Sequence, residues 1–391
     1  QDEVPPFPAS EAIQTIEDEI RIPLKKLFQE FNEEPIAAAS IAQVHVARLW
    51  DGTDVVVKVQ RPAISDNIET DINILTVAAR LLDKHVPESR FFNPIGIVEE
   101  FSRTVRKELD FAGEAKNCIK FRNNFKGSTA IYMPAVYPDF VTEKVLVMER
   151  IKGIRIDNIP AIVTTGLDRK EIAKKGIDAY FKMIFEDGFF HADPHPGNIF
   201  VMENGMLGFV DFGIVGRVSP EMMETMAKTF LALLNRDFDS LIDQYVELGI
   251  VSEDIDLEKF RREFKTDLID FLEPLYGLKL QEIDFAQYLD TVTHLAMKHR
   301  MQVPSDLLLI NKAMLILESI GRELDPEFDF IAASEPYVSN LVRKRYSPSS
   351  IYKRASKNVM EFSDFVLLFP KQLKMIIRKI LRDDLHIKMT H

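Results

Sequence analysis

Three side chains in the middle of the chain have the residue types and the order that phosphoryl transfer requires: Asp193, Asn198 and Asp211. The reaction needs a carboxylate beside the attacking oxygen, and oxygen ligands for a metal that bridges the phosphates. The five-residue step from Asp193 to Asn198 matches the spacing of such a catalytic loop. We therefore predict that Asp193 is catalytic, and that Asn198 and Asp211 bind Mg²⁺ beside ATP or ADP.

The loop that carries Asp193 reads HADPHPGN, and its prolines and glycine argue against the interior of a helix or strand. Irregular loops on a rigid scaffold commonly carry chemistry. His191 is expected to brace the loop backbone, whereas for His195 a structural role and a place near the phosphates are equally open. A metal site made of the two histidines is disfavoured, because Mg²⁺ prefers oxygen ligands to imidazole.

A second group of candidate residues lies near the start of the chain, in the segment AAASIAQV at 37–44. A kinase phosphate-covering loop reads G-x-G-x-x-G-x-V, and alanine occupies its three glycine positions here. Alanine adds a Cβ and stiffens the backbone, so we predict altered phosphate geometry and weaker transfer to an external acceptor. The nucleotide-binding candidates in this loop are Ala37, Ala38, Ala39, Ser40, Ala42 and Val44.

Lys58 follows Val44 by fourteen residues, in a VVVK segment where kinases carry V-A-I-K. It is expected to hold the phosphates and to need a carboxylate partner. The segment KELDFAGE offers Glu108, Asp110 and Glu114, and we favour Glu114 as that partner.

The last strand of the small lobe is expected at 145–149, and residues 151–153 look like a link between lobes. Backbone groups between Glu149 and Ile151 would pair with adenine, and Met148 would lie behind the ring. The apolar pattern is also that of a plain core strand, and the two interpretations are compatible, because one strand can pack in the core and border the adenine.

The elements that position these residues change in character along the chain. Strands are predicted at 42–49, 55–60 and 135–137, with a hairpin turn at Asp51-Gly52. After residue 153 a hairpin at 198–209, closed at Asn204-Gly205, interrupts a mostly helical region. The predicted helices cover 10–20 (with Ser10 as N-cap), 23–31, 66–85, 95–124, 169–187, 219–235, 237–249, 256–275, 283–300, 304–322 and 335–344. This layout predicts an α+β, protein-kinase-like two-lobed fold, with a small β-containing N-lobe that has extra helices and a large helical C-lobe.

Composition narrows the class of protein. The 391 residues are 46% hydrophobic and 28% charged, which is ordinary for a globular chain of this length. A single cysteine, Cys118, fits a reducing compartment. No apolar run approaches the ~18–20 residues of a membrane span, so the chain is expected to be soluble. The chain begins at Gln1, so we expect a fragment or a processed form.

Charge is distributed unevenly. The net charge is −12, but residues 343–391 hold 12 Lys/Arg against 4 Asp/Glu, a local +8 that leaves −20 for the rest. An acidic body without a basic stripe argues against nucleic-acid binding. The basic, apolar segment at 350–385 is typical of an amphipathic helix on an anionic membrane. Packing of that helix against the body is an equally good interpretation.

Two departures separate the chain from an ordinary protein kinase. Ala192 stands where an arginine usually precedes the catalytic aspartate. Ser219-Pro220-Glu221 follows Asp211 almost at once, where a kinase carries A-P-E after a much longer segment. Little room is left for a peptide-docking platform, so regulation by loop phosphorylation is not expected.

Taken together, AAASIAQVH, VVVKVQRP, KELDFAGEA, VMERIKG, HADPHPGN and DFG resemble the UbiB/ADCK family of ABC1-type atypical kinases. The resemblance covers about residues 1–330. It implies a link to ubiquinone and other isoprenoid-quinone pathways, a supporting Glu-x-Asp pair at Glu108 and Asp110, and Glu114 as the lysine-pairing glutamate.

The family also carries an N-terminal extension whose Lys-x-Gly-Gln motif restrains protein-kinase activity, and many members end in membrane-spanning helices. Neither feature occurs in this sequence. We therefore predict a truncated helical extension at 1–34, a kinase-like N-lobe at 35–150, a C-lobe at 151–330 and a basic amphipathic segment at 331–391. The expected location is a reducing compartment, on the cytoplasmic side or matrix-like, at the periphery of a membrane.

The leading hypothesis is an atypical kinase or ATPase that uses ATP and Mg²⁺ and supports prenyl-lipid metabolism at a membrane surface. A small-molecule kinase of the aminoglycoside or choline type ranks lower, since such enzymes lack the Ala-rich loop and the KELD segment. A third hypothesis, from another class, is a lipid-binding module in which ATP acts as a conformational ligand. The phosphoryl acceptor and the oligomeric state are left open.

Overall fold

The computed structural model of the chain describes residues 4–86, 94–247, 250–251, 255–275, 291, 294–301, 305–325 and 327. The helix predicted at 335–344, most of the helix at 283–300 and the basic tail lie outside these residues. Among the described helices, none is both long enough and apolar enough to cross a membrane.

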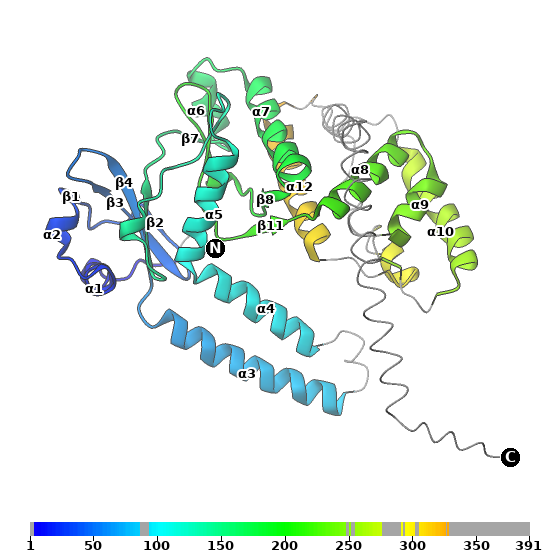
Figure 1. Ribbon diagram of the computed structural model, residues 1–391, viewed down its shortest axis with the longest axis horizontal. Helices are drawn as coiled ribbons and strands as arrows, with labels where there is room; N and C mark the ends of the chain where they lie inside the picture. The colour runs from blue at the N-terminus through cyan, green and yellow to red at the C-terminus, as the bar shows by residue number, and fades with distance from the viewer. Residues whose placement is uncertain are drawn as a thin grey trace, which may run out of the picture.

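The N-lobe is built on a five-stranded antiparallel sheet (Figure 1). The strand order is β1-β3-β4-β6, and β2 pairs with the first residues of β3. The elements are α1 (Ala9–Ile20), α2 (Leu24–Leu27), β1 (Glu30–Phe31), β2 (Ala37–Ala38), β3 (Ala42–Arg48), β4 (Asp54–Gln60) and β6 (Val145–Glu149).

Alternation along β4 decides which face carries the chemistry. Successive strand residues point to opposite faces, so Val55, Val57 and Val59 are fully buried together against Ala12 and Ile16 of α1. Lys58 therefore points to the other face, where α5 covers the sheet.

Helices α3 (Ile64–His85) and α4 (Pro94–Glu108) form an antiparallel pair below the sheet, and α5 (Phe111–Asn124) runs from the end of α4 into the centre of the molecule (Figure 1). The single helix predicted at 95–124 is wrong, because the structure breaks it at residues 109–110. The Asp110 carboxylate accepts a 2.8 Å hydrogen bond from the Gly113 amide and caps a new helix. A Cβ at position 113 would come within 2.6 Å of that carboxylate, so glycine is needed there.

The C-lobe combines a second sheet with helices. Its four strands follow the order β5-β10-β9-β7, and β8 pairs separately with β11. The strands are β5 (Ile131–Tyr132), β7 (Ile154–Arg155), β8 (Phe189–His191), β9 (Ile199–Val201), β10 (Leu207–Phe209) and β11 (Val215–Arg217). The helices are α6 (Ile159–Thr164), α7 (Arg169–Phe181, continued by a π turn at Lys182–Glu186), α8 (Pro220–Leu234), α9 (Phe238–Glu247), α10 (Leu257–Leu272) and α12 (Ser305–Leu324), with 3₁₀ turns at Pro196–Asn198 and Glu273–Leu275. A further 3₁₀ turn, Pro138–Phe140, packs beside β6 in the N-lobe.

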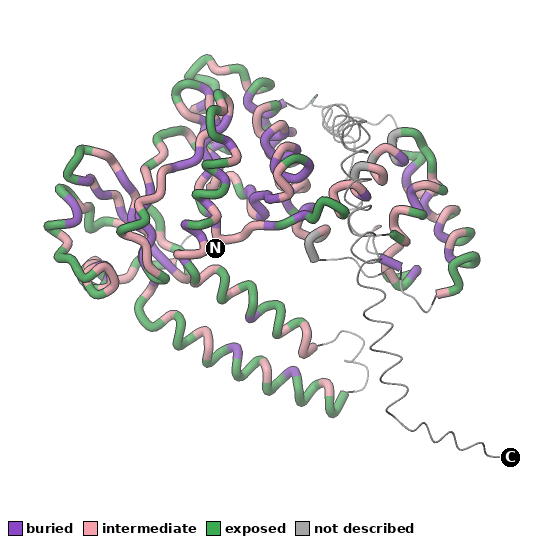
Figure 2. The backbone as a smooth tube through the Cα atoms, in the orientation of Figure 1, coloured by how far each residue is buried: buried purple, intermediate pink, exposed green. Residues whose placement is uncertain are grey.

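Buried residues concentrate in the β4–β6 region and around α7, whereas the α3–α4 pair is mostly exposed (Figure 2). The C-lobe core contains Tyr180, Phe189, Phe209 and Phe212, all fully buried. The resulting α+β, two-lobed architecture is the one predicted.

Several local predictions need correction. The second helix ends at Leu27 instead of running to residue 31, because Phe28 is extended and β1 follows. The first helix starts at Ala9 after Pro8, so Ser10 is not its cap. At 135–137 the backbone forms only an isolated bridge from Val136 to Met148, while β5 was missed. The hairpin turns at Gly52 and Gly205 are confirmed, with φ of 87° and 74°.

Candidate functional site

Lys58 lies at the centre of a charge cluster that joins the two lobes. Its Nζ donates to Glu114 Oε2 at 2.8 Å and is 3.6 Å from Asp211 Oδ2. Lys58 also lies over the ring of Phe111, at 5.0 Å from the centroid. The predicted partner Glu114 is thus the one that pairs with Lys58, and it pairs from the first turn of α5.

Glu114 also binds the backbone of the Asp-Phe-Gly segment. Its Oε1 accepts a hydrogen bond from the Phe212 amide at 3.3 Å. Asn117, one turn further along α5, donates to the Phe212 carbonyl at 3.0 Å. One helix therefore holds both the N-lobe lysine and the C-lobe segment that carries Asp211.

The environment keeps Lys58 charged. Burial alone would lower the pKa of Lys58, but the carboxylates of Asp211 and Glu114 raise the pKa above its ordinary value. The charge on Lys58 lowers the pKa of Asp211. Burial raises the pKa of Glu114, and Lys58 opposes that rise. Lys58 therefore stays an ammonium ion at neutral pH.

The loop with Asp193 is held from beneath by His191. The fully buried ring of His191 accepts the Asp193 amide at Nδ1 (3.2 Å) and contacts the Val210 carbonyl through Nε2 (3.1 Å). Burial lowers the pKa of His191, so the ring is neutral and can serve as acceptor and donor at once. This is the bracing role expected from the sequence.

His195 takes part in the local turn. It stands at the N-cap of the 3₁₀ turn Pro196–Asn198, and its Nδ1 accepts the Gly197 amide at 3.2 Å. Its ring is exposed. The structural alternative is therefore satisfied by an observed bond, whereas a contact with phosphate stays a prediction.

Asn198 and Asp211 have the chemistry that a magnesium ion requires. Asn198 Nδ2 donates to the Asp193 carbonyl at 3.2 Å. This bond uses the nitrogen of the side-chain amide, and the oxygen of the same amide is the atom that could bind a metal. Asp211 adopts φ of 59°, a left-handed conformation that is costly for a residue other than glycine and that clusters at functional sites. The Asp211 side chain is 48% exposed.

The oxygen atoms of Asp211 and Asn198 suit Mg²⁺, an ion that does not need all of its ligands from protein side chains. Among the described residues, no group of three or more His, Cys, Asp and Glu side chains is arranged to hold a metal. Mg²⁺ is commonly bound by one or two carboxylates together with substrate phosphates and water. Asp211 and Asn198 can supply such a partial oxygen shell.

The Ala-rich loop is held by backbone hydrogen bonds. Ala37 and Ala38 form β2 and pair with Val44 and Gln43, and the Ala39 amide donates to the Ala42 carbonyl at 2.8 Å. Ser40 is exposed at the tip. The segment thus forms a tight turn between β2 and β3, and its role as a phosphate cover stays a prediction.

The loop is also fastened from outside by Arg61, which sequence reasoning missed. Arg61 Nε donates to the Ala39 carbonyl at 3.0 Å, and an Nη donates to the Pro5 carbonyl at 2.7 Å. Its guanidinium lies over the ring of Phe7. The N-terminal segment is therefore tied directly to the loop.

The hinge offers fewer backbone groups than predicted. The Glu149 amide donates to the Ala135 carbonyl at 2.8 Å, and the Arg150 amide donates to the Asp54 carbonyl at 3.0 Å. The Glu149 carboxylate accepts from Tyr132 and the Ala135 amide. The prediction that the N–H groups of Glu149 and Arg150 pair with adenine is therefore corrected, because both groups already donate to backbone carbonyls within the N-lobe. Pairing of the Ile151 backbone with adenine stays a prediction.

Met148 and Glu108 border the same space. Met148 is buried beside Ala42, Leu146 and Phe111, on the face where Lys58 lies. Glu108 ends α4, and burial raises its pKa, followed by the charges of Asp211 and, more weakly, Asp193. Glu108 therefore lies within electrostatic reach of both C-lobe carboxylates.

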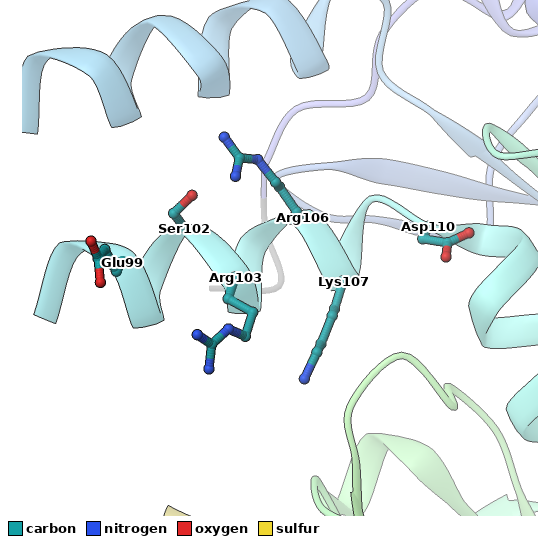
Figure 3. Close-up of a pocket in the computed structure, with 6 residues that line it drawn as sticks. All are labelled: Glu99, Ser102, Arg103, Arg106, Lys107 and Asp110. Atoms are coloured by element: carbon teal, nitrogen blue, oxygen red, sulfur yellow. The ribbon is translucent and has the colours of Figure 1, made fainter. Parts of the chain in front are cut away.

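A polar groove of about 510 Å³ runs along α4 toward Asp110. Arg106 points to α3, where it pairs with Glu69 at 2.7 Å, whereas Arg103 and Lys107 point away from α3 (Figure 3). The groove is lined by Glu99, Ser102, Arg103, Arg106, Lys107 and Asp110. Its basic groups lie beside the end of α4, close in sequence to Glu108.

A second missed residue contacts Asp193 directly. Lys312, on α12, places its Nζ 2.9 Å from Asp193 Oδ1. No local motif marks Lys312, because 119 residues separate it from its partner. Only folding brings α12 to the loop.

Comparisons with known proteins agree with this geometry. Residues 1–245 match the ABC1 atypical kinase-like domain, and residues 268–329 match the UbiB helical domain. The chain is similar to a "Probable protein kinase UbiB" of Aeromonas salmonicida, with 37% identity over 99% of this chain and 71% of that protein. It is also similar to one of Shewanella baltica, with 36% identity over 95% and 68%.

A solved structure shares the fold. It is described as the complex structure of Rv3197-erythromycin from Mycobacterium tuberculosis, and it is 23% identical, with a TM-score of 0.65 over 85% of this chain and 83% of that one. The family predicted from the motifs is confirmed: this chain belongs to the UbiB (ABC1-type) family of atypical kinase-like proteins.

Proposed function

We propose that the chain binds MgATP between its lobes and transfers the terminal phosphoryl group to an acceptor or to water. The observation that carries the proposal is the connected cluster of Lys58, Glu114 and Asp211: the 2.8 Å Lys58–Glu114 contact lies within the N-lobe, and the 3.6 Å Lys58–Asp211 contact joins the two lobes. Phosphoryl transfer is achieved mainly by positioning and electrostatic stabilisation, which such a cluster can supply.

Each residue has a role in this proposal. Lys58 holds the phosphates and Glu114 fixes Lys58. Asp193 orients the attacking hydroxyl or water and accepts its proton. Asn198 and Asp211 would hold Mg²⁺, which neutralises charge on the phosphates when bound. The nucleotide base lies against Met148, with the Ile151 backbone as its partner.

The remaining supporting residues shape this site. The Ala-rich loop, from Ala37 to Ala42, covers the phosphates with a stiffer backbone than glycine would give. Glu108 lies close enough to Asp211 for their charges to interact. This negative charge favours binding of the nucleotide as its Mg²⁺ complex over binding of the metal-free triphosphate. Asp110 acts through the α5 cap that places Glu114.

Conservative removal of two carboxylates tests the proposal. Asp193→Asn and Asp211→Asn should each reduce ATP turnover by about 10²–10⁴-fold with the fold intact. Asp178→Asn is a matched control, because Asp178 forms a lysine pair on the surface of α7, away from the cluster. Normal turnover in either site variant, with circular dichroism unchanged, would overturn the assignment.

The membrane and the acceptor are part of the same proposal. Helices α3 and α4 expose apolar side chains, including Ile74, Val77 and Leu81 at helical spacing and Ile97 and Phe101 opposite. Exposed apolar stripes of this kind mark interaction sites. These stripes support action at a membrane surface, and the UbiB name of the relatives supports a link to ubiquinone metabolism.

Vesicles distinguish this proposal from its alternatives. ATP consumption should rise when anionic vesicles containing a prenyl lipid are added, and neutral vesicles should have less effect. A small-molecule kinase, an alternative suggested by the erythromycin complex of the structural neighbour, would instead yield a phosphorylated soluble product. A nucleotide-gated lipid-binding module would keep nucleotide-dependent vesicle binding in Asp193→Asn.

A further inference from the structure

The lysine that contacts Asp193 comes from outside the kinase-like segment. Lys312 lies on α12, within the residues that match the helical domain and beyond those that match the kinase-like domain. The contact is 2.9 Å long, with the Lys312 side chain 50% exposed and the Asp193 side chain 33% exposed. Both side chains are therefore accessible from solvent to a ligand that binds beside Asp193.

The position of Lys312 is fixed by the packing of α12. One face of the helix carries Ile310, Ala313, Leu317 and Leu324, which are all buried in the C-lobe core at spacings of three, four and seven residues. Lys312 precedes Ala313 and stands at the edge of that buried face. The amphipathic pattern of α12 therefore determines where the ammonium group lies.

The catalytic loop itself supplies no permanent cation. Between Asp193 and Asn198 the sequence is Pro-His-Pro-Gly, and the Nδ1 atom of His195 accepts a backbone amide. Lys58 is already shared between two carboxylates. The Mg²⁺ that Asn198 and Asp211 would hold offsets part of the charge of a bound triphosphate, which leaves the Asp193 side of the site with Lys312 as its nearby cation.

The charges around the cleft point the same way. Glu108 is influenced by the carboxylates of Asp211 and Asp193 and by the ammonium groups of Lys58 and Lys312. With Glu114 added, four carboxylates face two lysines. A triphosphate adds further negative charge, and cations that stabilise charge on the transferred group contribute strongly to catalysis.

We infer that Lys312 is a nucleotide-binding and catalytic residue that leaves Asp193 and faces the terminal phosphoryl group when a nucleoside triphosphate binds. The inference rests on the proposed function. It makes Asp193 available to the acceptor at the moment when the triphosphate is in place, and it assigns a residue of the helical domain to the phosphoryl-transfer site.

The test compares two nucleotides that differ by the terminal phosphate. Lys312→Met keeps the length of the side chain and removes the charge, Lys312→Arg keeps the charge, and Lys174→Met is a matched control from the 2.6 Å Lys174–Asp178 surface pair. Binding of MgADP and of the Mg²⁺ complex of a non-hydrolysable ATP analogue is measured by calorimetry on the full chain. Turnover of ATP is measured in parallel.

Lys312→Met should weaken binding of the analogue by about tenfold or more, leave ADP affinity within about twofold, and lower kcat. Lys312→Arg should recover most of the loss, and Lys174→Met should match the wild type. An equal loss for ADP and analogue, unchanged affinities, or faster turnover in Lys312→Met would overturn the inference, the last by showing that the pair only restrains Asp193. Failure of the wild type to bind either nucleotide would overturn the proposed function as well.

Discussion

Two lysine–carboxylate pairs of nearly the same length differ in almost every other respect. Lys58–Glu114 measures 2.8 Å with side chains 14% and 2% exposed, whereas Lys312–Asp193 measures 2.9 Å with side chains 50% and 33% exposed. A buried pair is costly to break once formed, and an exposed pair contributes little. The first is thus suited to hold a position and the second to exchange partners with a ligand.

The neighbours of each pair extend the difference. Glu114 also accepts the Phe212 amide, and Lys58 also faces Asp211 and the ring of Phe111. Asp193, by contrast, is positioned through its backbone, by His191 and Asn198, and its carboxylate is left to Lys312. The N-lobe pair is part of a network of contacts, whereas the Asp193 carboxylate of the C-lobe pair can change its partner when a ligand binds.

The largest expected effect breaks the buried pair. Glu114→Ala leaves Lys58 buried with Asp211, at 3.6 Å, as its remaining carboxylate, and we expect the free energy of unfolding to fall by about 3–5 kcal/mol. Lys312→Met should change it by less than about 1 kcal/mol. Denaturant unfolding of both variants is the measurement. Equal destabilisation of the two would contradict the contrast.

A smaller effect concerns the support beneath Asp193. The pKa of His191 is lowered by burial, so the unfolded chain binds a proton that the folded chain does not. The contribution of neutral His191 to the free energy of unfolding is complete above the ordinary histidine pKa of about 6.5. It is lost as the pH falls below that value toward the lower pKa of the folded state, with a slope of at most about 1.4 kcal/mol per pH unit. Unfolding measured from pH 8 to 5 should show a gentler slope in His191→Gln. An identical slope would mean that His191 is not kept neutral.

The smallest effect acts on the placement of Glu114. Asp110→Ala removes the cap of α5 and should cost about 1 kcal/mol of stability. It should also weaken nucleotide binding, because the first turn of α5 carries Glu114. A loss of stability with unaltered nucleotide affinity would show that the buried pair does not depend on the cap.

Sequence reasoning succeeded where chemistry is local. Asp193, Asn198 and Asp211 stand within one short segment, and the VVVK segment places Lys58 in a strand, as the structure has it. Glu114 could be proposed because KELDFAGE offers three carboxylates as partners for the strand lysine, and the family resemblance implies this one.

It failed where a contact depends on distant packing or on a side chain competing with the backbone. Lys312 reaches Asp193 only because α12 packs on the C-lobe core. The break before Phe111 follows from a capping bond of Asp110 that hydrophobic periodicity does not reveal. The hinge amide of Arg150 is consumed by the Asp54 carbonyl, a pairing that needs the register of β4 and β6.

The most direct test is calorimetric titration of MgADP into the wild-type chain and into Asp211→Asn. Saturable heat from a single site is expected for the wild type, and its affinity should fall both in the variant and when Mg²⁺ is chelated. Absence of binding heat in the folded wild type, or binding that is indifferent to both Asp211 and Mg²⁺, would contradict a nucleotide site shared by the two lobes.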